Sequence, residues 1–358
     1  MNYIGSKLTL LPFITSSIES VVGRSVCNFA DIFAGTGVVG AHFRKRGAEV
    51  IANDMQYYSY VMLRNIIQDS QKIKFSGLET IPQTNALFCD KLHDIRNYLN
   101  SLDGKEGFIY NNYSLHGTKN GDIHRMYFSD DNAKRCDAIR QTIEEWKESG
   151  LINQEEYFFL LSSLLVSIDK VANTASVYGA FLKKLKSSAA KPLDFNFVEK
   201  ISSEKSGRAY NSNANELIKE IEGEVLYLDP PYNHRQYAAN YHILETIARY
   251  DNPEVRGVSG LRDYSAQSSA FCKKNEASDA LNDLIKNARF DYIFLSYNNE
   301  GIIPTSDIEK IFRSKGEYMC LSQDFRRYKA DSNRDYKNDR TTEYLHIIKS
   351  SNKTGCVE

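Results

Sequence analysis

Four consecutive residues in the second half of the chain combine a carboxylate, two prolines and an aromatic ring. They are Asp229, Pro230, Pro231 and Tyr232, and they follow the apolar run Val225–Leu228. Because consecutive prolines cannot continue a ladder of hydrogen bonds, we expect a strand to end at this point. The carboxylate, a proline carbonyl and the tyrosine ring would then lie together at the carboxyl end of that strand. They would form a receptor for a flat base that carries an amino group.

A second candidate site is a glycine-containing turn near the amino terminus. An apolar strand and a helix are predicted on either side of a turn that contains Gly35 and Gly37. Such a turn lets a ligand approach the backbone closely. With Gly40, the same glycines match G-x-G-x-x-G, the pattern of dinucleotide-binding proteins. The next predicted strand leads to Asp54, whose carboxylate is placed to accept the two hydroxyls of a ribose.

The glycine turn and Asp54 predict a sheet that binds a nucleoside. They are compatible with a nicotinamide oxidoreductase and with a protein that binds a nucleoside cofactor together with a nucleobase. A nicotinamide oxidoreductase needs both features, but hydride transfer has no use for the Asp-Pro-Pro-Tyr element. A receptor for an amino-bearing base therefore favours a protein that binds a nucleoside cofactor together with a nucleobase.

The combination resembles the S-adenosylmethionine-dependent DNA methyltransferases that methylate the exocyclic N6 of adenine. It is most similar to their Dam-like alpha group, in which the cofactor element precedes the catalytic element. The resemblance implies that Asp229, Pro230 and Tyr232 are catalytic and that these three, with Pro231, hold the target adenine. The cofactor is then S-adenosyl-L-methionine. The residues that we expect to bind it are Tyr3, Lys7, Asp31, Phe33, Ala34, Gly35, Gly37, Asp54, Met55, Asn213 and Ala214.

Individual roles are expected for several of these residues. Tyr3 and Lys7 match the family's amino-terminal motif, whose aromatic residue and lysine touch the methionine part of the cofactor. Asp31 is expected to hold the ammonium group, directly or through water, and Met55 to form an apolar wall for the cofactor adenine. The alternatives are a solvated lysine that opens a helix for Lys7 and a simple core position for Met55. Asn213 stands where the family usually carries an aspartate, which is a departure from its pattern.

The chemistry follows from the weak nucleophilicity of the adenine amine, whose lone pair is delocalised into the ring. Hydrogen bonds from its protons to Asp229 and the Pro230 carbonyl would direct the lone pair at the methyl group and stabilise the charge developing on nitrogen. A base in a duplex must be flipped out first, at a cost of roughly a few kcal/mol. Stacking on Tyr232 would return about 1–3 kcal/mol. No metal ion is expected to take part.

The predicted elements indicate an α/β protein. Strands are predicted at residues 26–30, 49–54, 225–228, 290–297, 318–321 and 344–348. We expect a Rossmann-like methyltransferase sandwich around one mixed, mostly parallel sheet, with both ligands at the carboxyl ends of its strands. Residues 1–90 and 209–358 are expected to form the catalytic, cofactor-binding domain, and residues 91–208 an inserted, mainly helical domain.

The insertion differs in character from the rest of the chain. Helices are predicted at residues 131–149 and 154–173, and an irregular loop or hairpin at 108–113. Seven lysines and arginines against three acids fall between residues 183 and 208. The resemblance implies that this insertion recognises the DNA target, and a helical lid with a solvated lysine face is the alternative.

Composition restricts the partners. The net charge of the 358 residues is −1, so affinity for DNA must rest on local basic patches. Six cysteines without a C-x-x-C pair and seven histidines without ligand spacing make structural zinc unexpected. Cys27 and Cys320 lie in apolar runs and are expected to be buried thiols. The longest apolar stretch, residues 157–168, is too short to cross a bilayer, so we expect a cytoplasmic protein without membrane contact.

The expected substrate is double-stranded DNA, and the expected state is a monomer or weak dimer. Under the resemblance, a cognate restriction endonuclease is a further candidate partner. An RNA adenine methyltransferase and a non-catalytic nucleic-acid-binding module remain as alternatives, because an everted base could come from either nucleic acid. The recognition sequence is not readable from the chain, since base contacts depend on a few side chains placed by the fold.

Overall fold

The computed structural model describes residues 4–68, 73–79, 81, 90–201, 203–326 and 340–350. The chain forms two compact units, and each is assembled from segments that are distant in the sequence. Unit 1 comprises Met1–Ile4, Ser70–Lys200 and Ala239–Tyr264. Unit 2 comprises Gly5–Asp69, Ile201–Ala238 and Ser265–Glu358.

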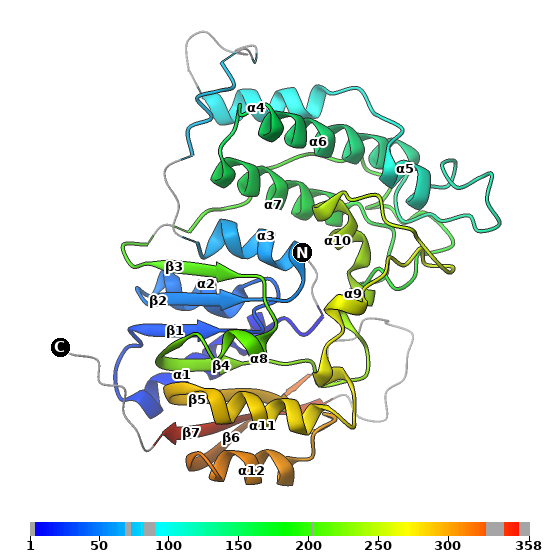
Figure 1. Ribbon diagram of the computed structural model, residues 1–358. Helices are drawn as coiled ribbons and strands as arrows, with labels where there is room; N and C mark the ends of the chain where they lie inside the picture. The colour runs from blue at the N-terminus through cyan, green and yellow to red at the C-terminus, as the bar shows by residue number, and fades with distance from the viewer. Residues whose placement is uncertain are drawn as a thin grey trace. The chain divides into compact units, whose positions relative to one another are not determined.

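Unit 2 is built on one seven-stranded sheet (Figure 1). The strands are β1 (Asn28–Asp31), β2 (Glu49–Asn53), β3 (Gly207–Tyr210), β4 (Glu222–Leu228), β5 (Arg289–Asn298), β6 (Gly316–Arg326) and β7 (Arg340–Ser350). Their order is β3-β2-β1-β4-β5-β7-β6. The pairs from β3 to β5 are parallel, whereas β7 runs antiparallel to both β5 and β6. The predicted α/β class with a mixed, mostly parallel sheet is confirmed.

Helices cover both faces of this sheet because the strands are apolar on both sides. On β4, Val225 and Tyr227 belong to one buried cluster, and Leu226 and Leu228 belong to the other. The first cluster includes residues of η1 (Lys7–Leu10), α1 (Leu11–Val22), α2 (Val38–Lys45) and α3 (Tyr57–Ile66). The second includes residues of α8 (Ala214–Leu217), η3 (Ala270–Cys272), α11 (Ala277–Asn287) and α12 (Thr305–Arg313). This is the layered arrangement that a buried parallel sheet requires.

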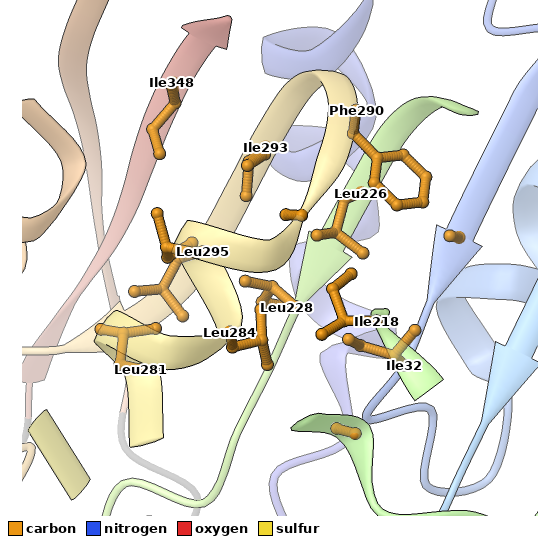
Figure 2. Close-up of a cluster of buried hydrophobic side chains, with 14 of the residues drawn as sticks. Ile32, Ile218, Leu226, Leu228, Leu281, Leu284, Phe290, Ile293, Leu295 and Ile348 are labelled. Atoms are coloured by element: carbon orange, nitrogen blue, oxygen red, sulfur yellow. The ribbon is translucent and has the colours of Figure 1, made fainter. Parts of the chain in front are cut away.

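Figure 2 shows the second cluster in detail, with side chains of β4 and β5 facing α11. Leu226 and Leu228 project from β4 toward the helix, which contributes Leu281 and Leu284. Every one of these leucines is inaccessible to solvent. Burial of this kind contributes about 1.5–3 kcal/mol for each large apolar side chain, so the cluster holds the end of β4 in place.

Unit 1 is helical. Its helices are α4 (Lys91–Ser101), α5 (Phe108–Tyr113), α6 (Asp130–Glu148), α7 (Gln154–Lys170) and α10 (His242–Arg249), and the short α9 (Tyr237–Asn240) has residues in both units. Ser129 caps α6, and Asn153 with Glu156 forms a capping box at the start of α7. The helices predicted at 131–149 and 154–173 are therefore confirmed, with α7 ending three residues early.

The loop or hairpin predicted at residues 108–113 is wrong, because α5 stands there. No side chain at its amino-terminal boundary caps this helix. Its first amides are instead satisfied by the buried Asp137 of α6, whose carboxylate accepts hydrogen bonds from Ile109 N at 3.0 Å and Tyr110 N at 2.8 Å. A capping group that is distant in the sequence leaves no local signal.

Two further expectations differ from the structure. The edge strand β3 had no predicted counterpart, since its sequence Gly-Arg-Ala-Tyr lacks an apolar run. Cys27 and Cys320 are exposed, whereas Cys136 and Cys272 are buried free thiols. Cys320 lies on the edge strand β6, which has a neighbouring strand on one side only. No helix within the described ranges is long and apolar enough to cross a membrane.

Candidate active site

The candidate site lies where the strand order reverses between β1 and β4 (Figure 1). These strands are parallel neighbours, and Asp31, the last residue of β1, pairs in register with Tyr227 of β4. The turn that contains Gly35 and Gly37 and the Asp-Pro-Pro-Tyr element therefore leave the same edge of the sheet side by side. Ligands of open α/β sheets bind in the crevice at such a point.

Asp229 directly follows the last residue of β4, as predicted from the two prolines. Its side chain is 18% exposed, and its Oδ1 lies 3.1 Å from Nζ of Lys7. Among the described residues, Oδ2 has no hydrogen-bond partner. Burial raises the pKa of this carboxyl to about 6; the Lys7 ammonium lowers it and the Glu343 carboxylate raises it. The acid is thus held on one oxygen and open on the other.

Tyr232 is half-buried and fixed from two sides. Its carbonyl accepts a hydrogen bond from Ile302 N at 3.0 Å. Its ring meets the ring of Tyr297 edge-on, with centroids 6.4 Å apart. A Cβ on Gly301 would stand 2.0 Å from the Tyr297 ring, so only glycine allows the loop after β5 to come this close. The loop thereby supports the turn that carries the tyrosine.

The glycine turn is tied to the end of β2. Ala34 N donates to the Asn53 carbonyl at 2.9 Å, and Gly35 N donates to Oδ2 of Asp54 at 2.8 Å. The other oxygen of Asp54 accepts from Gln56 N at 2.8 Å. A carboxylate oxygen can accept more than one hydrogen bond. Asp54 is therefore oriented by the backbone at the edge of the sheet where the glycine turn begins.

Phe33 and Asp31 flank the same turn. The Phe33 ring is half-buried and meets Phe271 edge-on at 5.1 Å. Asp31 is only 1% exposed, and its Oδ1 has no partner within the described part of the chain. Burial raises the pKa of Asp31 well above its ordinary value, and the nearby carboxylates of Asp229 and Asp54 raise it further. A buried, half-satisfied carboxyl next to other acids suits a cationic ligand group.

The segment before α8 also reaches the site. Asn211 Nδ2 donates to the carbonyls of Asp54 and Met55, at 2.8 and 3.0 Å. Met55 itself is half-buried. Asn213 is exposed, and its Oδ1 caps α8 by accepting from Asn215 N at 2.9 Å. Ala214 is buried in the core cluster. The segment expected near the cofactor adenine thus lies against Asp54 and Met55.

Lys7 is buried between two acids. Its Nζ lies 3.1 Å from Asp229 and 2.7 Å from Oε1 of Glu343, and these two neighbours raise its pKa against the opposing effect of burial. An ammonium group has three N–H donors, so one is left for a ligand. Tyr3, the other residue expected from the amino-terminal motif, lies outside the described residues.

Sequence reasoning missed three side chains that hold this site together. Asn53 donates to the Ile32 and Ser212 carbonyls and accepts from Ser212 N, which joins the ends of β1 and β2 to the segment before α8. Glu343 and Ser296 complete the surroundings of Lys7. Polar residues at the ends of otherwise apolar strands are the only local signal for them. No group of three or more His, Cys, Asp or Glu side chains in the described ranges is placed to hold a metal ion.

A sequence model of the D12 class N6 adenine-specific DNA methyltransferases matches residues 3–311. The chain belongs to this family. The match includes the glycine turn, Asp54 and the Asp-Pro-Pro-Tyr element, and the predicted adenine-specific DNA methyltransferase is confirmed. The RNA and non-catalytic alternatives are not favoured.

Several curated proteins are similar to this D12-class enzyme. The Type II methyltransferase M.NlaIII of Neisseria lactamica is 46% identical over 356 residues, which is 98% of this chain and 100% of that protein. The Type II methyltransferase M.CviAII of Paramecium bursaria Chlorella virus 1 is 36% identical over 92% of this chain and 93% of that protein. The Type II methyltransferase M.FokI of Planomicrobium okeanokoites is 38% identical over 92% of this chain but only 50% of its own length.

A methyltransferase of this family needs a methyl donor, and the residues present fit a cationic nucleoside donor. The unpartnered Oδ1 of Asp31 suits an ammonium group, and Asp54, set beside the glycine turn, suits a ribose diol. Four acids, Asp31, Asp54, Asp229 and Glu343, interact with one another or with the single ammonium of Lys7. A positively charged donor would reduce the excess of negative charge in the site.

Proposed function

We propose that the chain is a site-specific DNA methyltransferase that uses S-adenosyl-L-methionine and acts on N6 of an adenine flipped out of duplex DNA. The observation that supports this most directly is the Asp229 carboxyl, which is held by Lys7 on one oxygen and open on the other, next to the half-satisfied Asp31. One acid then faces the amine and the other faces the cofactor.

The cofactor, when bound, supplies a methyl group activated on a sulfonium. In the proposal, Asp31 and the third N–H of Lys7 bind its ammonium and carboxylate groups. Asp54 accepts the ribose hydroxyls, and Phe33 and Met55 lie beside its adenine with the segment at Asn213 and Ala214. Gly35 and Gly37 allow the backbone to come close to it.

The target amine is bound by the free oxygen of Asp229 and by the Pro230 carbonyl. These two acceptors take the two amino protons, and the Tyr232 ring stacks on the base. Hydrogen bonds to acceptors strengthen as the nitrogen becomes positive, so Asp229 binds the transition state more tightly than the ground state. The N–CH3 bond would form as the S–CH3 bond of the donor breaks and its electron pair returns to sulfur. The nitrogen would gain positive charge and then lose one proton to Asp229 or to water.

The biological setting is also a proposal. Relatives named as Type II methyltransferases, together with a modification methylase StsI of Streptococcus sanguinis that is 37% identical, support a role in restriction–modification with a cognate endonuclease. We further propose that the inserted domain expected at residues 91–208 recognises the target sequence. A cytoplasmic monomer or weak dimer is the state that we expect.

The test is the substitution Asp229→Ala, which removes the acceptor of the amino proton. We expect methyl transfer to a mixed-sequence duplex to fall at least about 1000-fold, as for removal of a principal transition-state contact. Transfer is measured with tritium-labelled cofactor, and cofactor binding is measured by calorimetry. The cofactor dissociation constant should change by less than about 3-fold. Persistent methylation, or preferential methylation of structured RNA, would refute the proposal.

A further inference from the structure

Glu343 is a carboxylate enclosed in the site from the last strand of the sheet. Its residue is 2% exposed, and its Oε1 lies 2.7 Å from Nζ of Lys7. The hydroxyl of Ser296 donates a hydrogen bond to the same oxygen. Lys7 also reaches Oδ1 of Asp229 at 3.1 Å, so one ammonium bridges two acids.

The strand pairing explains how a residue this late in the chain enters the site. β7 runs antiparallel to β5, and Glu343 is opposite Asn298, at the end of β5 that lies beside Asp229. Ser296 is two residues earlier on β5 and therefore points to the same face of the sheet. Glu343 also lies beyond residues 3–311, where the family model matches, so that match assigns it no role.

The cost of burying the Glu343 carboxylate indicates that this residue has a role in the site. Burying a second carboxylate beside Asp229 is costly, and Lys7 could neutralise only one of the two. Without Glu343, the Lys7 ammonium would interact with the Asp229 carboxylate alone, and nothing would hold it to one oxygen of that carboxylate. Glu343 instead holds Lys7 at a fixed point between the acids, so that Lys7 binds one oxygen of Asp229 and leaves the other accessible.

We infer that Glu343 is a positioning residue for methyl transfer: through Lys7 it orients the Asp229 carboxylate and keeps its second oxygen available to the target amine. This inference rests on the proposed role of Asp229. Ser296 fixes Glu343 in turn, through the hydrogen bond to its carboxylate.

The electrostatics of Asp229 agree with this arrangement. Lys7 faces it from η1, Glu343 from β7 and Asp31 from β1, and the hydroxyls of Tyr227 and Tyr232 interact with it electrostatically. Burial raises the pKa of Asp229, Lys7 lowers it and Glu343 raises it. Loss of the Glu343 charge would therefore lower this pKa, and loss of the Lys7 charge would raise it. The two substitutions are expected to act in opposite directions.

The experiment compares Glu343→Gln with Lys7→Met in the full-length enzyme. We expect Glu343→Gln to reduce kcat about 10-fold or more while the KM values for cofactor and DNA change less than about 3-fold. The acid limb of the single-turnover rate should move to lower pH, and Lys7→Met should move it to higher pH, by roughly half a unit or more each. Carbon-13 spectra of labelled aspartate, assigned with Asp229→Asn, report the same pKa without turnover.

The matched control is Glu317→Gln, the same chemical change at an exposed position of β6, which should leave every measurement unchanged. If Glu343→Gln does not fold, Glu343→Asp keeps the charge, withdraws it from Lys7 and should give a smaller shift in the same direction.

Two results would overturn the inference: a Glu343 variant with the rate and pH profile of the unmodified enzyme, or one that loses rate equally at every pH with the Asp229 resonance unmoved. The proposed function is tested separately by Asp229→Ala. An inactive Asp229→Ala with an unaffected Glu343→Gln would refute only the positioning role, whereas an active Asp229→Ala would refute the proposed function itself.

Discussion

At the scale of single residues, the site contains several acids whose two carboxylate oxygens have different hydrogen-bonding environments. Asp54 uses both carboxylate oxygens to hold backbone amides of the glycine turn and of Gln56. Asp229 uses one oxygen for Lys7, and Asp31 leaves its Oδ1 unpartnered among the described residues. A carboxylate that is already oriented loses little entropy when a ligand binds, which favours tight and directional recognition.

Asp54→Ala should weaken cofactor binding far more than DNA binding. It removes the acceptor proposed for the ribose and also frees Gly35 N from its partner. Hydrogen bonds to charged groups contribute about 1.5–3 kcal/mol, so we expect the cofactor dissociation constant to rise roughly 10- to 100-fold. Calorimetry measures the cofactor, and fluorescence anisotropy of a labelled duplex measures DNA.

Asp54→Asn serves as the matched control, because it keeps the shape and one acceptor and should give a smaller loss. Equal losses of cofactor and DNA affinity in Asp54→Ala would contradict the ribose role.

At the scale of elements, the turn from β1 to α2 depends on glycine for two separate reasons. Gly37 has a φ of 77°, in the left-handed region that other residues rarely adopt. A Cβ at this position would also stand 2.6 Å from Ile66 Cδ1 and 2.7 Å from Leu63 Cδ2. The tight packing of α3 against the turn therefore leaves no room for a side chain at Gly37.

Gly37→Ala should lower the free energy of unfolding by roughly 2–5 kcal/mol, the sum of about 1–2 for backbone strain and about 1–3 for overpacking. Gly23→Ala is the matched control: Gly23 has a φ of 81°, but a Cβ there meets nothing within 4 Å. It should lose only the strain, about 1–2 kcal/mol. Urea unfolding measures both, and equal losses would show that the contacts with α3 carry no energy.

At the scale of the whole molecule, the buried acids make stability depend on pH. Burial raises the pKa of Asp31 well above its ordinary value and that of Asp229 to about 6. A carboxyl with a raised folded-state pKa binds its proton more tightly in the folded chain. Its contribution to stability is therefore present below the unfolded pKa and is lost as pH rises through the folded pKa.

The increase in Tm on adding S-adenosylmethionine should consequently be larger at pH 8 than at pH 5, because a cation relieves repulsion between acids whose ionised fraction is greater at the higher pH. Differential scanning calorimetry at a fixed cofactor concentration checks this. Asp31→Asn should raise the Tm of the ligand-free protein at pH 8 and shrink the cofactor-induced increase. An increase that is the same at both pH values would rule out this coupling.

Much of the fold could be predicted from short stretches of the sequence. The apolar runs at β1, β2, β4 and β5 predicted their strands because alternation and burial act over a few residues. The Asp-Pro-Pro-Tyr element predicted the end of β4 for a similarly local reason, since proline cannot extend a ladder. The helix α5 escaped prediction because its first amides are satisfied by a partner distant in the chain, and the strand β3 because its four residues lack an apolar run.

The chemistry could be predicted from the chain alone, because a glycine turn, an acid after the next strand and then the Asp-Pro-Pro-Tyr element occur in the order of an adenine-specific methyltransferase. The contacts that hold Asp229 could not be predicted in this way, because they join residues that are distant in the chain. Lys7 and Glu343 are 336 positions apart, and nothing local distinguishes their pairing from two solvated charges. The sheet brings them together because β7 inserts antiparallel beside β5, and burial then makes the ion pair strong enough to orient Asp229.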